Sequence, residues 1–187
     1  WQRYVLLLAS LVFYYLNNYL LSICLILSIL SVYYGAILIQ KKDSKKKLIF
    51  ILTILFNILF LIGFKYSNIY LGLYNFVLGK NISFTNIIVP LGLSYYTLEA
   101  LSYLIDTYNN KYKADKNIIN VALYLLYFPL LIEGPISRYN DLNDQFNDNH
   151  KFNYKHIINA CVLIGFGLLK KLVIADRAAI YVNNVFN

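Results

Sequence analysis

The stretch LIFILTILFNILFLIGF, Leu48–Phe64, contains no charged residue and only two polar side chains, Thr53 and Asn57. A helix of this length approaches the ~20 residues that cross a ~30 Å hydrocarbon layer. Tyr19–Ile39 is similarly uncharged. The whole chain is 59% hydrophobic and only 14% charged, whereas soluble domains are roughly 45–50% apolar. We therefore predict an all-α, polytopic membrane protein.

The apolar residues fall into about six blocks that we expect to be membrane-embedded helices. Their predicted bounds are Tyr4–Leu16, Tyr19–Ile39, Leu48–Phe64, Ile87–Tyr108, Ile118–Ile136 and Ile157–Ala175. The first block is short for an upright span. Residues 1–187 are expected to form a single integral membrane region.

The basic residues lie in the connections between these blocks, so the net charge of +8 fits a membrane surface better than nucleic acid. Lysine and arginine favour the cytoplasmic side, and the loop Lys41–Lys47 is the richest in lysine. If that loop is cytoplasmic, alternation also places Arg3, Lys111–Lys116 and Lys170–Arg177 there. The opposite side receives Asn17–Asn18, Lys65–Asn86 and Ser137–His156. A re-entrant block would break this alternation, and Ile87–Tyr108 is the first candidate.

The block Ile87–Tyr108 is unusual because it carries acidic residues in an apolar background. On a helix, four polar residues spaced four, three and four positions apart share one face: Tyr95, Glu99, Ser102 and Asp106. We call them the polar stripe. A carboxylate among lipid tails costs a few kcal/mol or more, and such residues normally face a protein interior or a water-filled path. The stripe is therefore predicted to line an internal path.

Two further features interrupt the apolar background. Pro129 and Gly134–Pro135 break or kink the fifth block, and Glu133 and Arg138 flank the second break. These two charges pair with each other, or one of them pairs with Glu99 or Asp106. Lys170 and Lys171 most simply mark the cytoplasmic interface, with a phosphate of an acyl donor as the alternative contact. Both histidines lie in a polar loop without neighbouring cysteines, so no metal site is predicted.

Several stretches, in this order, resemble the membrane-bound O-acyltransferase family, in the branch that acetylates alginate and bacterial cell-wall polysaccharides. They are VPLGLSYYT at Val89–Thr97, ALSYLIDTY at Ala100–Tyr108, Tyr127–Pro129, GPISRY at Gly134–Tyr139 and LKKLVIAD at Leu169–Asp176. In this family an essential histidine follows a later Trp- and Arg-rich motif. The resemblance thus implies that the catalytic residue lies beyond Asn187, and that the chain is an incomplete domain without its C-terminal part.

The resemblance implies a ring of helices around a tunnel in a bacterial cell membrane. It implies a cytoplasmic acyl donor such as acetyl-CoA or an acyl-carrier species, with no other bound cofactor. An extracytoplasmic relay or transferase protein is the implied partner. The polar stripe, Glu133 and Arg138 would line the tunnel or orient its helices, and Lys170 and Lys171 would be donor-side contacts. This fragment alone is expected to be inactive.

Three functions follow as hypotheses. The first is transfer of an acyl group, most simply acetyl, for O-acylation of a cell-surface polysaccharide. The second is D-alanyl transfer to teichoic acid within the same family. The third is a proton-coupled transporter or flippase that uses Glu99 and Asp106 as a relay. A later membrane segment containing Trp and His would favour the acyl-transfer hypotheses.

Overall fold

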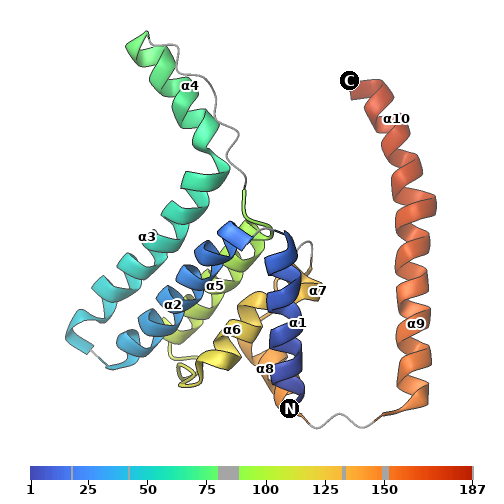
Figure 1. Cartoon of the computed structure of the whole chain (residues 1–187), viewed down its shortest axis with the longest axis horizontal. Coiled ribbons are helices and arrows are strands. Elements are labelled where there is room, and N and C mark those ends of the chain that lie inside the picture. Colours follow the sequence, from blue (N-terminus) through green and yellow to red (C-terminus); the bar gives the residue numbers. More distant parts are fainter. Residues whose placement is uncertain (18, 42, 80–88, 132–133, 149–151, 187) are drawn as a thin grey trace. The chain divides into compact units, whose positions relative to one another are not determined.

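The computed structural model describes residues 1–17, 19–41, 43–79, 89–131, 134–148 and 152–186. Every regular element within these ranges is a helix, which confirms the predicted all-α class (Figure 1). The chain forms two units, Trp1–Asp148 and Asn149–Asn187, and each is described by itself. Glu133 lies outside the described residues, as do Ile87 and Ile88 at the start of the fourth predicted block.

The first unit begins with three apolar helices: α1 (Gln2–Asn17), α2 (Tyr19–Lys41) and α3 (Lys46–Lys65). A short 3-10 turn, Asp43–Lys45, joins the last two. The segments Ser22–Lys41 and Lys46–Lys65, of 20 residues each, are long enough to cross a bilayer at 1.5 Å per residue. The predictions at Tyr19–Ile39 and Leu48–Phe64 are thus confirmed as membrane-length helices, while α1 is shorter. Helix α4 (Ser67–Leu78) follows α3 and ends at Gly79.

A buried polar contact joins α2 to α3 in the middle of these apolar helices. Asn57 on α3 is 1% exposed. Its Oδ1 accepts a 2.6 Å hydrogen bond from Ser28 Oγ, and its Nδ2 donates to Ser31 Oγ at 3.0 Å. A glycine, Gly35, faces Thr53 so closely that a Cβ there would lie 2.6 Å from Thr53 Cγ2. Small residues and satisfied amides are what allow helices to pack closely in lipid.

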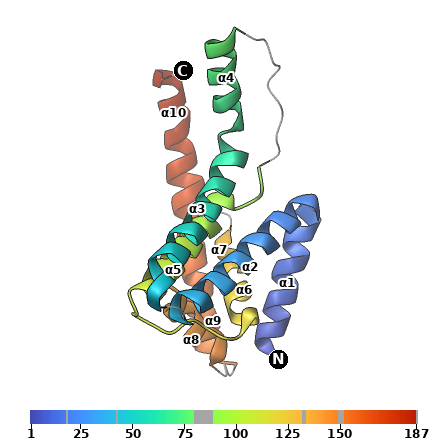
Figure 2. The ribbon, with the colours of Figure 1, turned by 90° about the vertical axis from the view of Figure 1, so that its left-hand side faces the viewer.

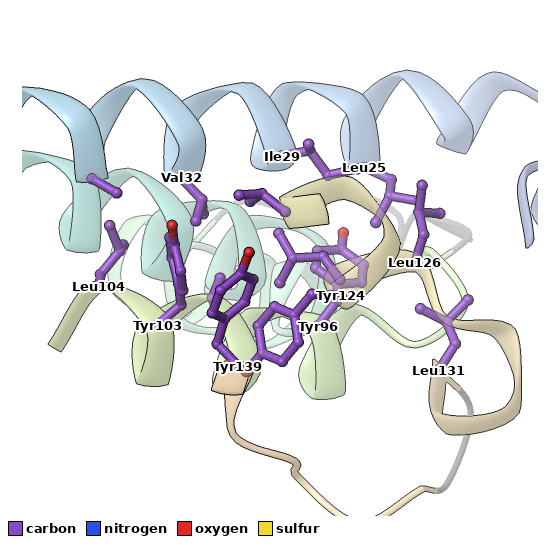
Figure 3. Close-up of a cluster of buried hydrophobic side chains, with 14 of the residues drawn as sticks. Leu25, Ile29, Val32, Tyr96, Tyr103, Leu104, Tyr124, Leu126, Leu131 and Tyr139 are labelled. Atoms are coloured by element: carbon purple, nitrogen blue, oxygen red, sulfur yellow. The ribbon is translucent and has the colours of Figure 1, made fainter. Parts of the chain in front are cut away.

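Helix α5 (Leu93–Tyr108) packs against both α2 and α3 (Figures 1 and 2). It begins later than the predicted block because Gly92 adopts a left-handed conformation with φ of 69°. This conformation is natural for glycine and costly for other residues. Helix α5 contributes two of the largest fully buried side chains of the core, Tyr96 and Tyr103, which pack beneath α2 beside Ile29 and Val32 (Figure 3).

The fifth predicted block, Ile118–Ile136, is not one membrane helix. Helix α6 (Ile118–Leu126) begins where the Asn117 side chain accepts a hydrogen bond from the backbone N–H of Ile119. Its nine residues extend about 14 Å, less than half of a bilayer core. A four-residue helix, α7 (Phe128–Leu131), follows. The described residues 134–138 are non-helical and lead to α8 (Tyr139–Asn147).

Basic segments that are far apart in the sequence gather at one end of the first unit, which we call the basic end. Lys46 Nζ lies 3.3 Å from Asn110 Oδ1, and Gln40 Nε2 donates to the backbone oxygen of Tyr112 at 3.3 Å. Arg3 Nη1 donates to Asn120 Oδ1 at 3.0 Å. As the charge distribution predicts, Arg3, the α2–α3 connection and the loop after α5 lie together.

The structure differs from the predicted alternation at the connection that follows the fifth block. Ser137–His156 was expected opposite Lys111–Lys116, yet the Tyr139 hydroxyl donates to Asp115 Oδ2. The Tyr139 ring also lies 5.7 Å from that of Tyr112. Proline and glycine break the block into pieces too short to cross, so the chain turns back to the basic end. The block that turns back is the fifth, not the fourth as expected. The alternation therefore no longer assigns Lys170 and Lys171 to the basic end.

We predict that cysteine labelling in intact cells will detect this return. In a background with Cys24 and Cys161 replaced by serine, cysteines introduced at Lys113 and Asp144 should react from the same side of the membrane. A cysteine introduced at Asn75, on α4 beyond the other end of α3, should react from the opposite side (Figure 1). If Asp144→Cys reacted from the same side as Asn75→Cys, the return of the chain to the basic end would be contradicted.

In the second unit, α9 (Tyr154–Leu169), a π-helical stretch (Lys170–Ala175) and α10 (Asp176–Phe186) follow without a break. The resulting helix of 33 residues is long and apolar enough to span a membrane. The predicted end at Ala175 is wrong, because the helix continues to Phe186. Lys170 and Lys171 are exposed in this unit and lie in the π-helical stretch rather than at a helix end.

Candidate functional site

The polar stripe of α5 turns its two carboxylates toward the protein interior. Glu99 and Asp106 are each 5% exposed, while Tyr95 and Ser102 are half-buried. The burial agrees with the physical argument that carboxylates in an apolar segment avoid lipid. A helix places these residues on one face because the spacing of three and four positions matches its 3.6-residue turn.

Glu99 faces the chain that returns after α7. The backbone N–H of Ser137 forms a hydrogen bond to its side chain. On the neighbouring helix, the Tyr124 hydroxyl donates to the backbone oxygen of Ser137 at 2.8 Å and lies 3.3 Å from that of Glu99. These contacts hold residues 134–138, which we call the return segment, along α5. They satisfy backbone groups that a non-helical segment would otherwise leave unpaired.

Asp106 forms an ion pair with Lys111, at 2.7 Å from Asp106 Oδ1 to Lys111 Nζ. This pairing differs from the predicted alternatives, in which Arg138 was one possible partner of Asp106. Lys111 itself is 52% exposed, so the pair joins a buried carboxylate to an ammonium at the surface of the basic end. The pair fixes the loop after α5 against the end of the helix.

A surface pocket of about 370 Å³ brings several predicted residues together. Ser102 and Asp106 line it from α5, and Arg138 lines it from the return segment. Its remaining lining is apolar, from Leu98, Leu101, Ile105 and Ile136. The structure thus gathers part of the polar stripe with Arg138, although nothing in it assigns them a catalytic role. Glu133 lies outside the described residues, and Lys170 and Lys171 lie in the second unit.

A cluster of four tyrosines around Asp115 was not predicted from the sequence. Tyr103, Tyr112, Tyr124 and Tyr139 come from three helices and a loop, and the rings of Tyr103 and Tyr139 lie 4.8 Å apart (Figure 3). Asp115 accepts from the Tyr139 hydroxyl and from Asn120 Nδ2, the latter at 2.8 Å. Burial, followed by the hydrogen bond to Asp115, raises the pKa of Tyr139 further above its ordinary value, and the neutral phenol is the donor in this contact.

No local pattern marks this cluster, because its members are separated by turns and by the unpredicted return. It connects the loop after α5 to the start of α8. Through Asn120 it also reaches Arg3 on α1. No group of three or more His, Cys, Asp or Glu residues within the described ranges is arranged to hold a metal ion.

Comparison with known proteins finds bacterial O-acetylation proteins. The chain is 31% identical to the peptidoglycan O-acetyltransferase of Helicobacter pylori, over 93% of this chain and 38% of that protein. It is 32% identical to the probable alginate O-acetylase AlgI of Pseudomonas syringae pv. tomato, over 81% of this chain and 30% of that protein. For AlgI of Pseudomonas fluorescens the identity is 37%, over 54% of this chain and 20% of that protein.

The chain therefore corresponds to well under half the length of these relatives. No family model matches it, and no solved structure matches it. The match to the Helicobacter pylori protein nevertheless extends over 93% of the chain, and the names of the relatives agree with the branch that the motifs at Val89–Thr97 and Gly134–Tyr139 resemble. This similarity and the all-α architecture of membrane-length helices support the resemblance of the chain to the membrane-bound O-acyltransferase family.

Proposed function

We propose that the protein containing this chain transfers an acyl group, most simply acetyl, to hydroxyl groups of a cell-surface polysaccharide. The observation that carries the proposal is the pair of buried carboxylates on α5, in a membrane protein whose relatives are named O-acetyltransferases. Glu99 lies against the return segment, and Asp106 pairs with Lys111. An acyl donor such as acetyl-CoA or an acyl-carrier species would approach from the cytoplasm. An extracytoplasmic relay or transferase protein would receive the group.

The basic end is proposed to face the cytoplasm, because its lysines follow the positive-inside tendency. Acyl transfer needs a general base and a site that excludes water. The base is proposed to be a histidine outside this chain. Lys170 and Lys171 remain proposed donor-side contacts.

In this scheme Glu99 and Asp106 are positioning residues rather than nucleophiles. Each has a partner that explains how it acts: Glu99 holds the Ser137 backbone, and Asp106 holds Lys111. Loss of either would displace the return segment or the loop after α5. Small displacements of this kind, remote from the reacting atoms, lower turnover because the reacting groups lose their alignment.

The test replaces Glu99 in the full-length protein in its native host and measures ester-linked acetate on the envelope polysaccharide. Glu99→Ala should insert and accumulate normally, yet lower acetylation by about 10- to 100-fold, because misplacement of about 1 Å can cost that much. Glu99→Gln keeps the acceptor for the Ser137 N–H and should restore much of the activity. Asp144→Asn, which changes an exposed carboxylate on α8, should leave acetylation unchanged.

The same samples separate the alternatives. Loss of D-alanyl esters in place of acetyl esters would replace the proposal with D-alanyl transfer. Unchanged esters of both kinds at equal protein levels would show that Glu99 is not needed for acyl transfer. An accompanying loss of proton-coupled transport would then favour the transporter hypothesis.

A further inference from the structure

A second pocket, of about 510 Å³, lies at the basic end and is separate from the pocket lined by Ser102 and Arg138. It lies between the α2–α3 region and the loop after α5. The residues that line it are Ile39, Gln40, Lys46, Asn110, Lys111, Tyr112 and Lys113. Of these described lining residues three are lysines and none is acidic. We call this site the lysine pocket.

The walls of the lysine pocket are held in place by contacts within the protein. Lys46 Nζ lies 3.3 Å from Asn110 Oδ1 and 4.8 Å from the centre of the Tyr108 ring. The Tyr108 ring is itself stacked on Phe50, with ring centres 4.2 Å apart. On the other wall, Gln40 donates to the backbone oxygen of Tyr112 at 3.3 Å. The two sides are therefore joined to each other without any ligand.

The charges of the pocket are only partly balanced. Lys111 is neutralised by Asp106 at 2.7 Å, whereas the partners of the Lys46 ammonium among the described residues are a neutral amide and an aromatic ring. Lys113 forms no hydrogen bond or ion pair with any residue that the structure describes. The preference of lysine for the cytoplasmic side explains why these residues lie at this end. It does not explain why lysines from two separate connections converge on one concavity, where like charges repel.

An anion with several acceptor oxygens would balance these charges. Phosphate is the natural choice, because lysine ammonium groups bind it through charge-assisted hydrogen bonds. At a membrane surface a phosphate comes either from an anionic lipid headgroup or from a soluble acyl donor. Both sources offer the same chemistry to the three lysines, and the Asn110 amide adds a neutral polar group to the lining.

We propose that the lysine pocket binds a phosphate group, carried by an acyl donor or by a lipid headgroup. The donor alternative rests on the proposed acyltransferase function, whereas the lipid alternative does not. The assignment of phosphate to this pocket does not depend on any role of the polar stripe.

The experiment uses the full-length protein in nanodiscs and two probes. Acetyl-CoA is titrated onto protein in phosphatidylcholine, with S-acetylpantetheine, which lacks phosphate, as the matched ligand control. Phosphatidylglycerol retained by the protein is measured separately by native mass spectrometry from mixed nanodiscs. The variant Lys46→Gln/Lys113→Gln is compared with Lys65→Gln/Lys155→Gln, which removes the same charge at exposed lysines outside the pocket.

The pocket variant should weaken binding of at least one phosphate probe by about tenfold or more, as expected for loss of hydrogen bonds to a charged group. The control variant should retain binding, and S-acetylpantetheine should show no dependence on Lys46 and Lys113. Lys46→Arg/Lys113→Arg keeps both charges and should keep most of the affinity, which separates loss of charge from loss of folding. Equal binding of both probes by the pocket and control variants would overturn the proposal.

The result also distinguishes this proposal from the proposed function. Lysine-dependent binding of acetyl-CoA would support the donor alternative. Lysine-dependent binding of phosphatidylglycerol alone would support the pocket as a lipid site, even if the protein proved to have no acetyltransferase activity. Normal acetylation in a pocket variant that no longer binds phosphatidylglycerol would likewise support the lipid alternative.

Discussion

Replacing Gly92 with alanine is expected to destabilise the protein by about 3 kcal/mol, which combines the cost of left-handed backbone with that of overpacking. Gly92 has a φ of 69°, a conformation that a side chain disfavours. A Cβ there would also lie 2.9 Å from Leu131 Cγ and closer still to the carbonyl oxygen of Leu131. The methyl group would therefore push α7 away from the start of α5. The measurement is chemical denaturation of the full-length protein in detergent micelles.

Gly79 provides a matched control for this prediction. It has a similar φ of 62°, but a Cβ at Gly79 would meet no atom of the described residues within 4 Å. Gly79→Ala should therefore cost only the backbone part, about 1–2 kcal/mol. If both variants lost the same stability, the contact between Gly92 and Leu131 would not be what positions α7.

Replacing Asp115 with alanine is expected to cost about 2–4 kcal/mol, because it leaves several polar groups without their partner. The carboxylate accepts from the Tyr139 hydroxyl and from Asn120 Nδ2, and its other oxygen accepts from the backbone N–H of Asn117 at 2.7 Å. The Tyr139 side chain is only 3% exposed, so water cannot readily replace the lost acceptor. The same denaturation measurement tests this, and labelling of the Asp144→Cys variant reports any displacement of α8.

Two companion variants separate the hydrogen bonds from the packing of the tyrosine rings. Tyr139→Phe keeps the ring contacts with Tyr103 and Tyr124 and removes one hydrogen bond, so it should cost about 1 kcal/mol. Asp144→Ala removes an exposed carboxylate from α8 and should change stability by no more than about 0.5 kcal/mol. A cost for Asp115→Ala no greater than that for Asp144→Ala would show that the cluster depends on its rings alone.

The interior position of Glu99 and Asp106 was predictable from the sequence, because it follows from local spacing and from the cost of charge in lipid. The partners of these two carboxylates were not predictable. Asp106 pairs with Lys111, only five positions away, through a loop in which Asn110 has a φ of 56°. Glu99 meets Ser137 only because the chain turns back after α7. No periodicity in the sequence reports such a turn.

The apolar blocks by themselves determined the all-α class and the membrane-length helices, since burial in lipid depends on the composition of each segment alone. The ordered motifs between Val89 and Asp176 indicated the family. Tertiary structure decided the path of the chain after α6. Helix α6 is too short to cross, so its continuation depends on contacts with remote residues. At one end Leu131 packs against Gly92, and at the other the Tyr139 hydroxyl donates a hydrogen bond to Asp115. These long-range contacts bring the chain after the fifth block back to the basic end. The contact between Gln40 and Tyr112 forms the lysine pocket there.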